Sequence, residues 1–537
     1  MGDEVKVDLF LRKATGLVKE IGPAGAFVLP WSSMAGSGIT LYAMSVIYSY
    51  PTGSVPLAFL IVGVPTILSA ATIALMMMCA PRSAGGYVWG TRFLDPFLGW
   101  FGAGWVYWLV QVFSIALIGA VIGAVYPVIF VTMGTATKWT ALYNFGVTLA
   151  SSQFLQAATT VVTIVVLGLL CLIEIKHYMK ILITIWSLNT IGMVVSMALF
   201  LVNNASTIPG NWDSLWGAGS YETITALALK YNLAGYVAST TTGFWGDTLA
   251  IIAYIFWALT GYEAVAYVAG EVRNPRASFL YFFMAGMVST VAWYTAITAA
   301  AYNSYGDFVL KYNYVYNLLI AGKLSGADAA SVSYMQLPSM PLFAASLGGT
   351  PVLQVLGAFW FWPLTSILTT YLLCTRSSFG MAFDRMFPAA FGAINDRTHT
   401  PVKGSLLNIG VCVIWSLIFL TTFGFLASAA NTTFWFAFAY LIFSISAIAL
   451  PYKRKDIWEK GVHRRILGIP DTTLLGALSA IGMLWLVALS TIGITLTGWN
   501  VTLIWMALGV FLYVYYLHKL EKRGINIMQV YGEVPPP

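Results

Sequence analysis

The chain has 537 residues, of which 59% are hydrophobic, 15% aromatic and only 9% charged. Soluble globular domains contain roughly 45–50% apolar and about 25% charged residues, so this composition excludes an ordinary soluble enzyme. The formal charge of +7 could indicate a nucleic-acid partner, and the positions of the 27 Lys and Arg residues along the chain must decide that point.

Long apolar runs dominate the sequence from residue 22 onwards. A transmembrane helix needs about 20 apolar residues to cross a hydrocarbon core of roughly 30 Å, and about twelve runs meet this requirement. We predict spans at 22–48, 55–80, 97–133, 155–175, 179–203, 247–270, 279–302, 351–384, 403–427, 432–452, 473–494 and 497–518. The predicted fold class is therefore an all-α polytopic membrane protein.

Basic residues alternate between the two sides of the membrane. An even number of spans places both termini on one side, and 23 of the 27 Lys and Arg residues fall in the tails and loops of that side. The positive-inside rule then predicts cytoplasmic termini, and the basic excess requires no nucleic-acid partner. The sequons at Asn204, Asn431 and Asn500 all fall in predicted external loops, where glycosylation depends on the host.

The predicted spans divide the chain into segments. These are a cytoplasmic tail (1–21), five helices (22–203), an external loop (204–246), five further helices (247–452) that contain a second external loop (303–350), a basic cytoplasmic loop (453–472), two helices (473–518) and a cytoplasmic tail (519–537). Both external loops are rich in Gly, Ser, Thr, Asn and Tyr. We predict that each is a lid with at most one helical hairpin.

The first span contains residues that break a helix at mid-membrane depth. Its segment WSSMAGSGITLYAM holds Ser32, Ser33, Gly36, Ser37 and Gly38. If the helix unwinds here, backbone N–H groups at the start of the second half-helix form an anion site, and the freed carbonyls form a cation site. Close helix packing through small residues is the alternative explanation of this segment.

The sixth span carries a similar interruption beside an acid. Glu263 is the one carboxyl that falls within a predicted span, and Thr260-Gly261 precedes it in an otherwise apolar run. An ionisable group at membrane depth indicates a functional site, whereas a packing glycine beside a protonated, hydrogen-bonded glutamate is the alternative. Breaks in spans 1 and 6 are what two five-helix repeats of inverted topology would produce, with a substrate bound between them.

Four segments resemble the amino acid–polyamine–organocation (APC) superfamily of secondary transporters. They are AGSGI at 35–39, PRSAGGYVWGTRFLDPFLGWFGAGWVYW at 81–108, FWALTGYEAVAYVAGEVRNPRASF at 256–279 and TRSSFGMAFDRMFPAAFGAINDRTHTPVKG at 375–404. They occur in the family's order and at matching topological positions. The resemblance implies the fold of two inverted five-helix repeats, with broken helices 1 and 6 and two additional C-terminal helices.

The resemblance also implies how an amino acid is held. The substrate carboxylate would meet the N–H groups at the first break, the ammonium would meet carbonyls of both breaks, and aromatic side chains would close the site from outside. The implied substrate-binding residues are Met34, Ala35, Gly36, Ser37, Gly38, Ile39, Tyr107, Phe256, Trp257, Ala258, Thr260 and Gly261. Arg82, Arg92, Arg273, Arg276, Arg376 and Asp384 would form an inner salt-bridge network and loop anchors.

The coupling ion is left open by the sequence. Glu263 resembles a glutamate that some family members use as a proton-responsive gate, but Asn189 stands where many proton-coupled members carry a lysine. Thr369 and Thr370 align with a hydroxyl pair that binds sodium in sodium-coupled relatives, and oxygen ligands suit a hard cation. Hydrogen bonding of these hydroxyls to their own helix is the alternative. We slightly favour the proton.

The predicted function is a permease that moves an amino acid across the plasma membrane by alternating access, with a neutral amino acid favoured as the substrate. An amino acid/amine exchanger is an alternative within transport, and a transport-inactive accessory or sensor subunit is an alternative of another class. We expect no enzymatic activity, no cofactor and no metal site, with a sodium ion at Thr369 and Thr370 as the alternative that the sequence leaves open. The expected partners are the amino acid, a proton or sodium ion, and the lipid bilayer.

Overall fold

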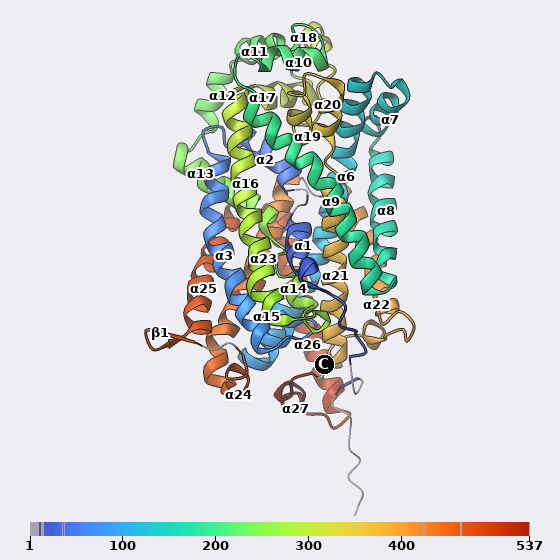
Figure 1. Ribbon diagram of the computed structural model, residues 1–537, viewed down its shortest axis with the longest axis vertical. Helices are drawn as coiled ribbons and strands as arrows, with labels where there is room; N and C mark the ends of the chain where they lie inside the picture. Colours follow the sequence, from blue (N-terminus) through green and yellow to red (C-terminus); the bar gives the residue numbers. More distant parts are fainter. Residues whose placement is uncertain are drawn as a thin grey trace, which may run out of the picture.

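The computed structural model describes residues 10–11, 15–34, 36, 38–422, 425–461 and 464–535, and side chains at 419–427 are left out of the description. Long helices run along the long axis of the molecule (Figure 1). Short helices of the two long connections, including α10, α11 and α18, gather at one end, which we call the lid face. Helices α24 and α27 and the C-terminus lie at the other end, which we call the terminal face.

The described residues contain ten helices that are long and apolar enough to cross a membrane. They are Val55–Cys79, Pro96–Thr137, Gln153–Leu172, Ile175–Val202, Phe244–Tyr267, Pro275–Tyr305, Pro351–Phe383, Ser428–Lys453, Asp471–Gly493 and Leu496–Glu521. Two shorter apolar helices, Gly38–Tyr48 and Val402–Ile418, lie where spans 1 and 9 were expected. The all-α polytopic membrane class is confirmed, and the pairing of the helices into inverted repeats stays a prediction.

The helical elements of the first half run from residue 23 to residue 240. They are α1 (Pro23–Met34), η1 (Gly38–Tyr42), α2 (Ala43–Ser45), η2 (Val46–Tyr48), α3 (Val55–Cys79), α4 (Gly85–Trp89), η3 (Gly90–Leu94), α5 (Pro96–Leu98), η4 (Gly99–Val106), α6 (Tyr107–Thr137), α7 (Thr140–Ser151), α8 (Gln153–Leu169), η5 (Leu170–Leu172), α9 (Ile175–Val202), α10 (Ile208–Trp216), α11 (Ser220–Lys230) and α12 (Leu233–Thr240).

The second half begins at residue 244 and adds one short hairpin of strands. Its elements are α13 (Phe244–Ile255), η6 (Phe256–Leu259), α14 (Ala264–Tyr267), η7 (Ala269–Glu271), α15 (Pro275–Ala277), η8 (Ser278–Phe283), α16 (Met284–Tyr305), α17 (Phe308–Ile320), α18 (Gly326–Ser331), α19 (Met340–Ala345), α20 (Pro351–Ala358), α21 (Trp362–Phe383), η9 (Ala389–Gly392), α22 (Val402–Thr422), α23 (Phe425–Lys453), α24 (Lys455–Trp458), β1 (Arg465–Ile466), β2 (Ile469–Pro470), α25 (Asp471–Ser490), η10 (Thr491–Gly493), α26 (Leu496–Glu521) and α27 (Ile527–Gly532).

Helix α3 shows how local sequence defines a span. The Ser54 side chain accepts a hydrogen bond from the Leu57 N–H at its N-terminus, and proline occupies the first turn, where its missing N–H costs nothing. The helix is apolar on all sides, as expected of a segment that packs against protein on one side and lipid on the other. It ends at Cys79, shortly before Pro81, which cannot continue a helix.

The two long loops that we predicted to be external contain more helix than expected. Residues 204–246 hold α10, α11 and α12, and residues 303–350 hold α17, α18 and α19, so the prediction of at most one hairpin in each loop is wrong. The extra helices are short and pack on one another through buried aromatic residues, with Trp212 of α10 4.9 Å in ring-centroid distance from Phe308 of α17. Tertiary packing of this kind stabilises helices too short to form alone.

Two buried ion pairs join segments at the terminal face. Arg92 of η3 pairs with Asp384 at the end of α21, and Arg376 of α21 pairs with Glu271 of η7. Arg273, which follows η7, pairs with Glu20 in a more exposed position. The predicted network of inner salt bridges is therefore present around Arg92, Arg376 and Asp384.

Candidate functional site

The first helix breaks where the sequence predicted it. Helix α1 ends at Met34, and the Gly36 N–H donates to the Met34 carbonyl at 2.7 Å in a tight turn before η1 begins at Gly38. The Ser33 carbonyl, freed at the end of α1, accepts a hydrogen bond from Ser366 Oγ of α21 at 2.9 Å. The predicted contacts of Ala35 and Ser37 lie outside the described residues.

The second break lies in the sixth span. The short 3₁₀ segment η6 ends at Leu259, Thr260 is extended, and Gly261 takes a φ of +89°, which L side chains rarely adopt. The Thr260 N–H and hydroxyl both donate to the Trp257 carbonyl, at 3.2 and 2.8 Å. The chain resumes as α14 at Ala264, so the break covers only a few residues.

The two breaks pack directly on each other. A Cβ added to Gly38 would lie 2.4 Å from the Cβ of Ala258, and one added to Gly36 would lie 2.7 Å from Ser366 Oγ. A Cβ at Gly261 would collide with the Ser33 side chain. Gly38 and Gly261 therefore allow the close approach of the two interrupted helices, Gly36 allows the close approach of α21, and Gly261 also adopts a backbone conformation that favours glycine.

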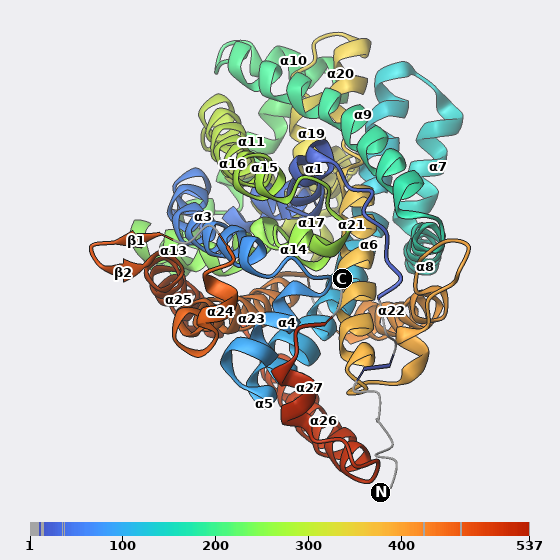
Figure 2. The same cartoon turned by 60° about the horizontal axis from the view of Figure 1, so that its bottom comes forward.

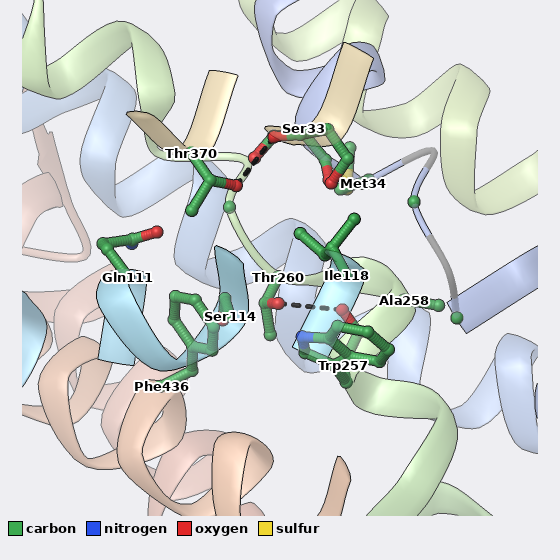
Figure 3. A pocket seen from close by; sticks show the side chains of 14 residues that line it. Ser33, Met34, Gln111, Ser114, Ile118, Trp257, Ala258, Thr260, Thr370 and Phe436 are labelled. Carbon is green, nitrogen blue, oxygen red and sulfur yellow. Dashed lines mark hydrogen bonds between the residues drawn. The ribbon is translucent and has the colours of Figure 1, made fainter. Parts of the chain in front are cut away.

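A small cavity lies between the breaks and α6. It is lined by Ser33, Met34, Gly36, Gly38, Gln111, Ser114, Ile118, Trp257, Ala258, Thr260, Gly261, Ser366, Thr370 and Phe436. Figure 3 shows Gln111, Ser114 and Ile118 on α6 and Trp257 and Thr260 at the second break. Among the described residues that line it, no side chain is charged, and the hydroxyls, one amide and backbone atoms of the breaks supply its polar groups.

The cavity brings together half of the residues that the sequence implicated. Of the predicted substrate-binding residues, Met34, Gly36, Gly38, Trp257, Ala258, Thr260 and Gly261 line it, and Thr370 lines it from the predicted sodium pair. Ile39, Tyr107, Phe256, Glu263, Asn189 and Thr369 are buried but do not line this cavity. The structure thus places the backbone residues of the breaks at the cavity and most of the predicted aromatic residues elsewhere.

Helix α6 contributes residues that sequence reasoning missed. Gln111 and Ser114 are buried and line the cavity, and both polar ends of the Gln111 amide and the Ser114 hydroxyl lack a hydrogen-bond partner among the described residues. Buried polar groups normally have a partner, so these groups are available to a substrate or to water. A glutamine inside an apolar span was the signal that could have identified this wall. Phe436, Ser366 and Ile118 gave no comparable signal.

Glu263 lies behind the cavity in a polar cluster. Its Oε1 accepts a hydrogen bond from the Tyr107 hydroxyl at 2.6 Å, and its Oε2 accepts one from the Tyr440 hydroxyl at 2.5 Å. Tyr440 Oη in turn accepts the Gly261 N–H at 2.9 Å. A continuous path of hydrogen bonds therefore connects the carboxyl to the backbone of the second break. Tyr107 lies in this cluster, stacked on Tyr267 with ring centroids 4.2 Å apart.

The sequence matches a known protein family over most of its length. A family model described as amino acid permease matches residues 21–513, which is nearly the whole chain. The chain belongs to the amino acid permease family. Proteins of this family are transporters rather than enzymes, and the resemblance to the APC superfamily is confirmed.

One curated relative of the permease is similar over part of its length. It is the "Cationic amino acid transporter 8, vacuolar" of Arabidopsis thaliana, 24% identical over 319 residues. The match covers 57% of this chain and 46% of the relative, so it spans about half the length of the plant protein. With its apolar helices, the permease is a multi-pass membrane protein.

The other candidate coupling residues of the permease bond locally. The Thr369 hydroxyl donates to the Thr365 carbonyl at 3.0 Å, and the Thr370 hydroxyl donates to the Ser366 carbonyl at 2.8 Å, both one turn back in α21. This is the local bonding weighed as the alternative to a sodium site. The Asn189 carbonyl accepts a hydrogen bond from Trp362 Nε1 at 3.2 Å, which ties α9 to the start of α21.

Proposed function

We propose that the permease moves a neutral amino acid across the plasma membrane by alternating access. The observation that carries this proposal is the cavity between the two breaks, whose described lining has backbone and hydroxyl groups but no charged side chain. A zwitterion needs partners for one carboxylate and one ammonium, and helix termini at broken spans supply both without fixed charges. A charged side chain on the substrate would have no counter-ion there.

The substrate carboxylate meets the N–H groups at the first break in this proposal. The ammonium meets carbonyls of Met34 and Thr260, because the Trp257 carbonyl already accepts two hydrogen bonds from Thr260. The amide of Gln111 and the hydroxyl of Ser114, which lack partners, complete the polar contacts from the opposite wall. Trp257 and Phe436 leave an apolar side for the substrate side chain.

Proton coupling through Glu263 is the second part of the proposal. The carboxyl is the charge-changing group joined by hydrogen bonds to the backbone of the second break, through Tyr440 and Gly261. Gain or loss of a proton changes whether Glu263 can accept hydrogen bonds from both tyrosines at once. It therefore changes the hydrogen bonding that holds the second break in place. Sodium at Thr369 and Thr370 is less favoured, because Thr369 does not line the cavity and only Thr370 could offer its oxygen to an ion there.

The name of the plant relative favours a second substrate class, a cationic amino acid. Glu263 would have to serve as its counter-ion, which requires release from Tyr107 or Tyr440. The relative is described as vacuolar, so an internal membrane is the alternative to the plasma membrane.

Uptake by the purified permease in proteoliposomes tests these proposals. We expect concentrative uptake of labelled neutral amino acids under an inward proton gradient, without sodium and with little competition from lysine or arginine. Dependence on sodium would contradict proton coupling, and preferred uptake of cationic amino acids would contradict the neutral substrate. Uptake that needs a preloaded amino acid or amine would identify an exchanger, and no uptake in any condition would favour the accessory-subunit alternative.

Two variants test the roles that we propose for Glu263 and Gln111. Glu263→Gln should flatten the pH dependence of uptake while substrate still binds, and an unchanged pH profile would remove Glu263 from coupling. Gln111→Leu keeps the size of the side chain but removes both polar ends, so we expect substrate affinity to fall by roughly tenfold, as for one lost buried hydrogen bond. Gln354→Leu, in α20 and away from the cavity, is the matched control.

A further inference from the structure

A short β-hairpin projects from the side of the molecule near the terminal face. It consists of β1 and β2, and it connects α24 to α25. Figure 1 shows it beside the lower part of α25, and Figure 2 shows it extending outward beyond that helix. We call residues 464–470 the side hairpin. The helix that follows it, α25, exposes the apolar side chains of Ile481 and Leu484, as a lipid-facing helix does.

The base of the side hairpin is held by Asp471, the first residue of α25. The Asp471 N–H donates to the Arg464 carbonyl at 2.9 Å, and Asp471 Oδ2 accepts a hydrogen bond from the Arg464 N–H at 3.1 Å. Asp471 is buried, and beyond this base the two strands pair in antiparallel fashion. The side hairpin is therefore a fixed continuation of the span.

Apolar side chains occupy the tip and one face of the side hairpin. Successive residues of a strand point to opposite faces, and Ile466 pairs directly with Ile469, so these two share a face. They are 45% and 43% exposed, and Leu467 at the tip is 97% exposed. On the other face, the Arg465 guanidinium lies 5.5 Å from the centre of the buried Trp458 ring. The side hairpin thus separates an apolar face from a cationic one.

The turn at the tip does not itself require an apolar residue. Leu467 has a φ of +53° and Gly468 a φ of +82°. Two-residue hairpin turns with positive φ at both positions favour Asn or Asp followed by Gly, and a leucine adopts this conformation only at a cost. An asparagine would suit both the turn and an aqueous environment. The leucine therefore indicates that the tip lies in apolar surroundings.

The length of the adjoining span places the side hairpin at the edge of the bilayer. The span Asp471–Gly493 has 23 residues, which is about 34 Å at 1.5 Å per residue. A hydrocarbon core is roughly 30 Å thick, so Asp471 lies near its boundary when the span is centred. Leu467 is four residues away, which is at most about 13 Å along a strand. The tip can therefore reach the interface between headgroups and acyl chains.

Basic residues are concentrated in and before the side hairpin. Residues 454–470 contain two acids, Asp456 and Glu459, and five basic residues, Arg454, Lys455, Lys460, Arg464 and Arg465. Both acids pair within residues 454–459, whereas Arg464 and Arg465 directly precede the apolar tip. Anionic headgroups attract such a segment, and the terminal face is the side predicted to be cytoplasmic, where anionic lipids are enriched.

We propose that the side hairpin is a membrane anchor that inserts its apolar tip into the leaflet at the terminal face. Ile466, Leu467 and Ile469 enter the boundary between headgroups and acyl chains, and Arg464 and Arg465 bind anionic headgroups. An apolar surface bordered by cations is suited to such an interface. The anchor holds the adjoining ends of α23 and α25 at the bilayer surface, whatever the substrate and the coupling ion are.

Spin-label depth measurements on the full-length protein in liposomes test the anchor. A nitroxide is attached at Leu467→Cys, and its accessibility to oxygen, which concentrates in the bilayer, is compared with its accessibility to a water-soluble nickel chelate. We expect oxygen to have the greater access to this label. A label at Lys522→Cys, an exposed position just after α26, should show the reverse. The unchanged protein, treated with the same reagent, gives the signal from native cysteines for subtraction.

Charge variants test the role of the two arginines with the label kept at position 467. In vesicles of phosphatidylcholine and phosphatidylglycerol, Arg464→Gln/Arg465→Gln should lower the ratio of inserted to aqueous label by about tenfold, since each cation contributes to attraction of an anionic surface. In phosphatidylcholine alone the same variant should have little effect. Lys522→Gln/Arg523→Gln removes the same charge from exposed positions elsewhere on the terminal face and should leave the ratio unchanged.

Three results would overturn the anchor. Greater access of the nickel chelate than of oxygen to the label at Leu467→Cys would place the tip in water. Spin–spin broadening between labels would show that a second copy of this chain, and not lipid, covers the tip. An equal effect of the two double variants would show that Arg464 and Arg465 contribute only to the general charge of the terminal face.

Discussion

Arg92 and Asp384 form a bidentate ion pair in which both side chains are buried. Arg92 Nη1 and Nη2 donate to Asp384 Oδ2 and Oδ1 at 2.6 and 2.8 Å, and the side chains are 0% and 1% exposed. The pair joins η3, which follows the second span, to the end of α21 at the terminal face. Any conformation that opens this face between these two segments must break or move it.

Loss of one partner of this pair should destabilise the protein strongly. Asp384→Asn leaves the Arg92 charge buried without its counter-ion, and we expect the free energy of unfolding to fall by about 3–5 kcal/mol. The measurement is denaturant-induced unfolding in detergent. Asp456→Asn, which removes the carboxylate of an exposed pair with Arg454, should change stability by about 1 kcal/mol or less. Similar effects of the two variants would contradict the role assigned to burial.

The C-terminal segment is bound to the same region. The Tyr531 ring is buried, its hydroxyl lies 3.1 Å from the Tyr87 hydroxyl, and the Arg92 guanidinium lies 4.8 Å from the ring centre. Arg92 Nε and Arg82 Nε also donate to the carbonyls of Glu533 and Pro535, at 3.2 and 2.8 Å. The segment 527–535 is therefore attached by one aromatic anchor and by arginines from the loop between the second and third spans.

Tyr531→Ala should release this segment. Removal of a buried aromatic side chain costs about 3–5 kcal/mol, so we expect backbone amides of residues 527–535 to exchange with deuterium at least about tenfold faster. Hydrogen exchange followed by mass spectrometry measures this. Tyr515→Ala, at a position that is 50% exposed on α26, should leave the exchange of 527–535 unchanged. An unchanged exchange rate in Tyr531→Ala would show that the arginines alone hold the segment.

The breaks were predictable from sequence because their cause is local. Glycines and serines at 32–38 and Thr260-Gly261 interrupt apolar runs. These interruptions are visible in the sequence without knowledge of the neighbouring helices. The membrane-spanning segments were predictable for the same reason, since length and hydropathy define them. The helices of the two long loops are harder to predict from sequence. They are too short to give a clear helical pattern, and they depend on packing between α10 and α17.

The side-chain partners in the candidate site were less predictable because they are distant in sequence. Tyr107 and Glu263 are 156 residues apart, and Tyr440 approaches Glu263 from α23. No spacing rule brings three such residues together, so the sequence predicts Tyr107 at the substrate and gives no role to Tyr440. The position of Gln111 is more open to prediction, because one polar amide in an apolar span is itself a signal. The arrangement of the helices decides which of these residues face the cavity.

Close contact between the two breaks leads to a prediction for Gly38. A Cβ at this position would lie 2.4 and 2.6 Å from the Cβ and Cα of Ala258, and a backbone atom cannot move aside as a flexible side chain can. Gly38→Ala should therefore separate the breaks and reduce uptake to background, while the protein remains monodisperse in gel filtration. Gly410→Ala, in α22 with open space around it, should retain full uptake. Normal uptake by Gly38→Ala would remove the first break from the substrate site.

The two long loops, 204–246 and 303–350, which we predict to be lids, are joined at the lid face by a contact between Lys230 of α11 and Asp328 of α18. Lys230 Nζ donates to Asp328 Oδ1 and Oδ2 at 3.0 and 2.7 Å, and the hydroxyls of Tyr231 and Ser325 donate to Oδ2 at 2.7 Å each. The Lys230 ammonium and these hydroxyls lower the pKa of Asp328 to about 2. The bond to Asp328 raises the pKa of Lys230.

This contact should hold the lids together over a wide pH range. Because the pKa of Asp328 is lowered by folding, its contribution is complete above the ordinary aspartate pKa of 3.8 and is lost as the pH falls towards 2. The raised pKa of Lys230 keeps the ammonium charged throughout the neutral range. We therefore expect hydrogen exchange of residues 220–240, corrected for intrinsic rates, to show constant protection from about pH 5 to pH 9.

Asp328→Asn should raise exchange there several-fold at every pH, whereas Asp307→Asn, which removes an exposed pair with Lys311 in α17, should have little effect. Equal protection in Asp328→Asn and the unchanged protein would mean that the aromatic contacts between the lids are sufficient without this ion pair.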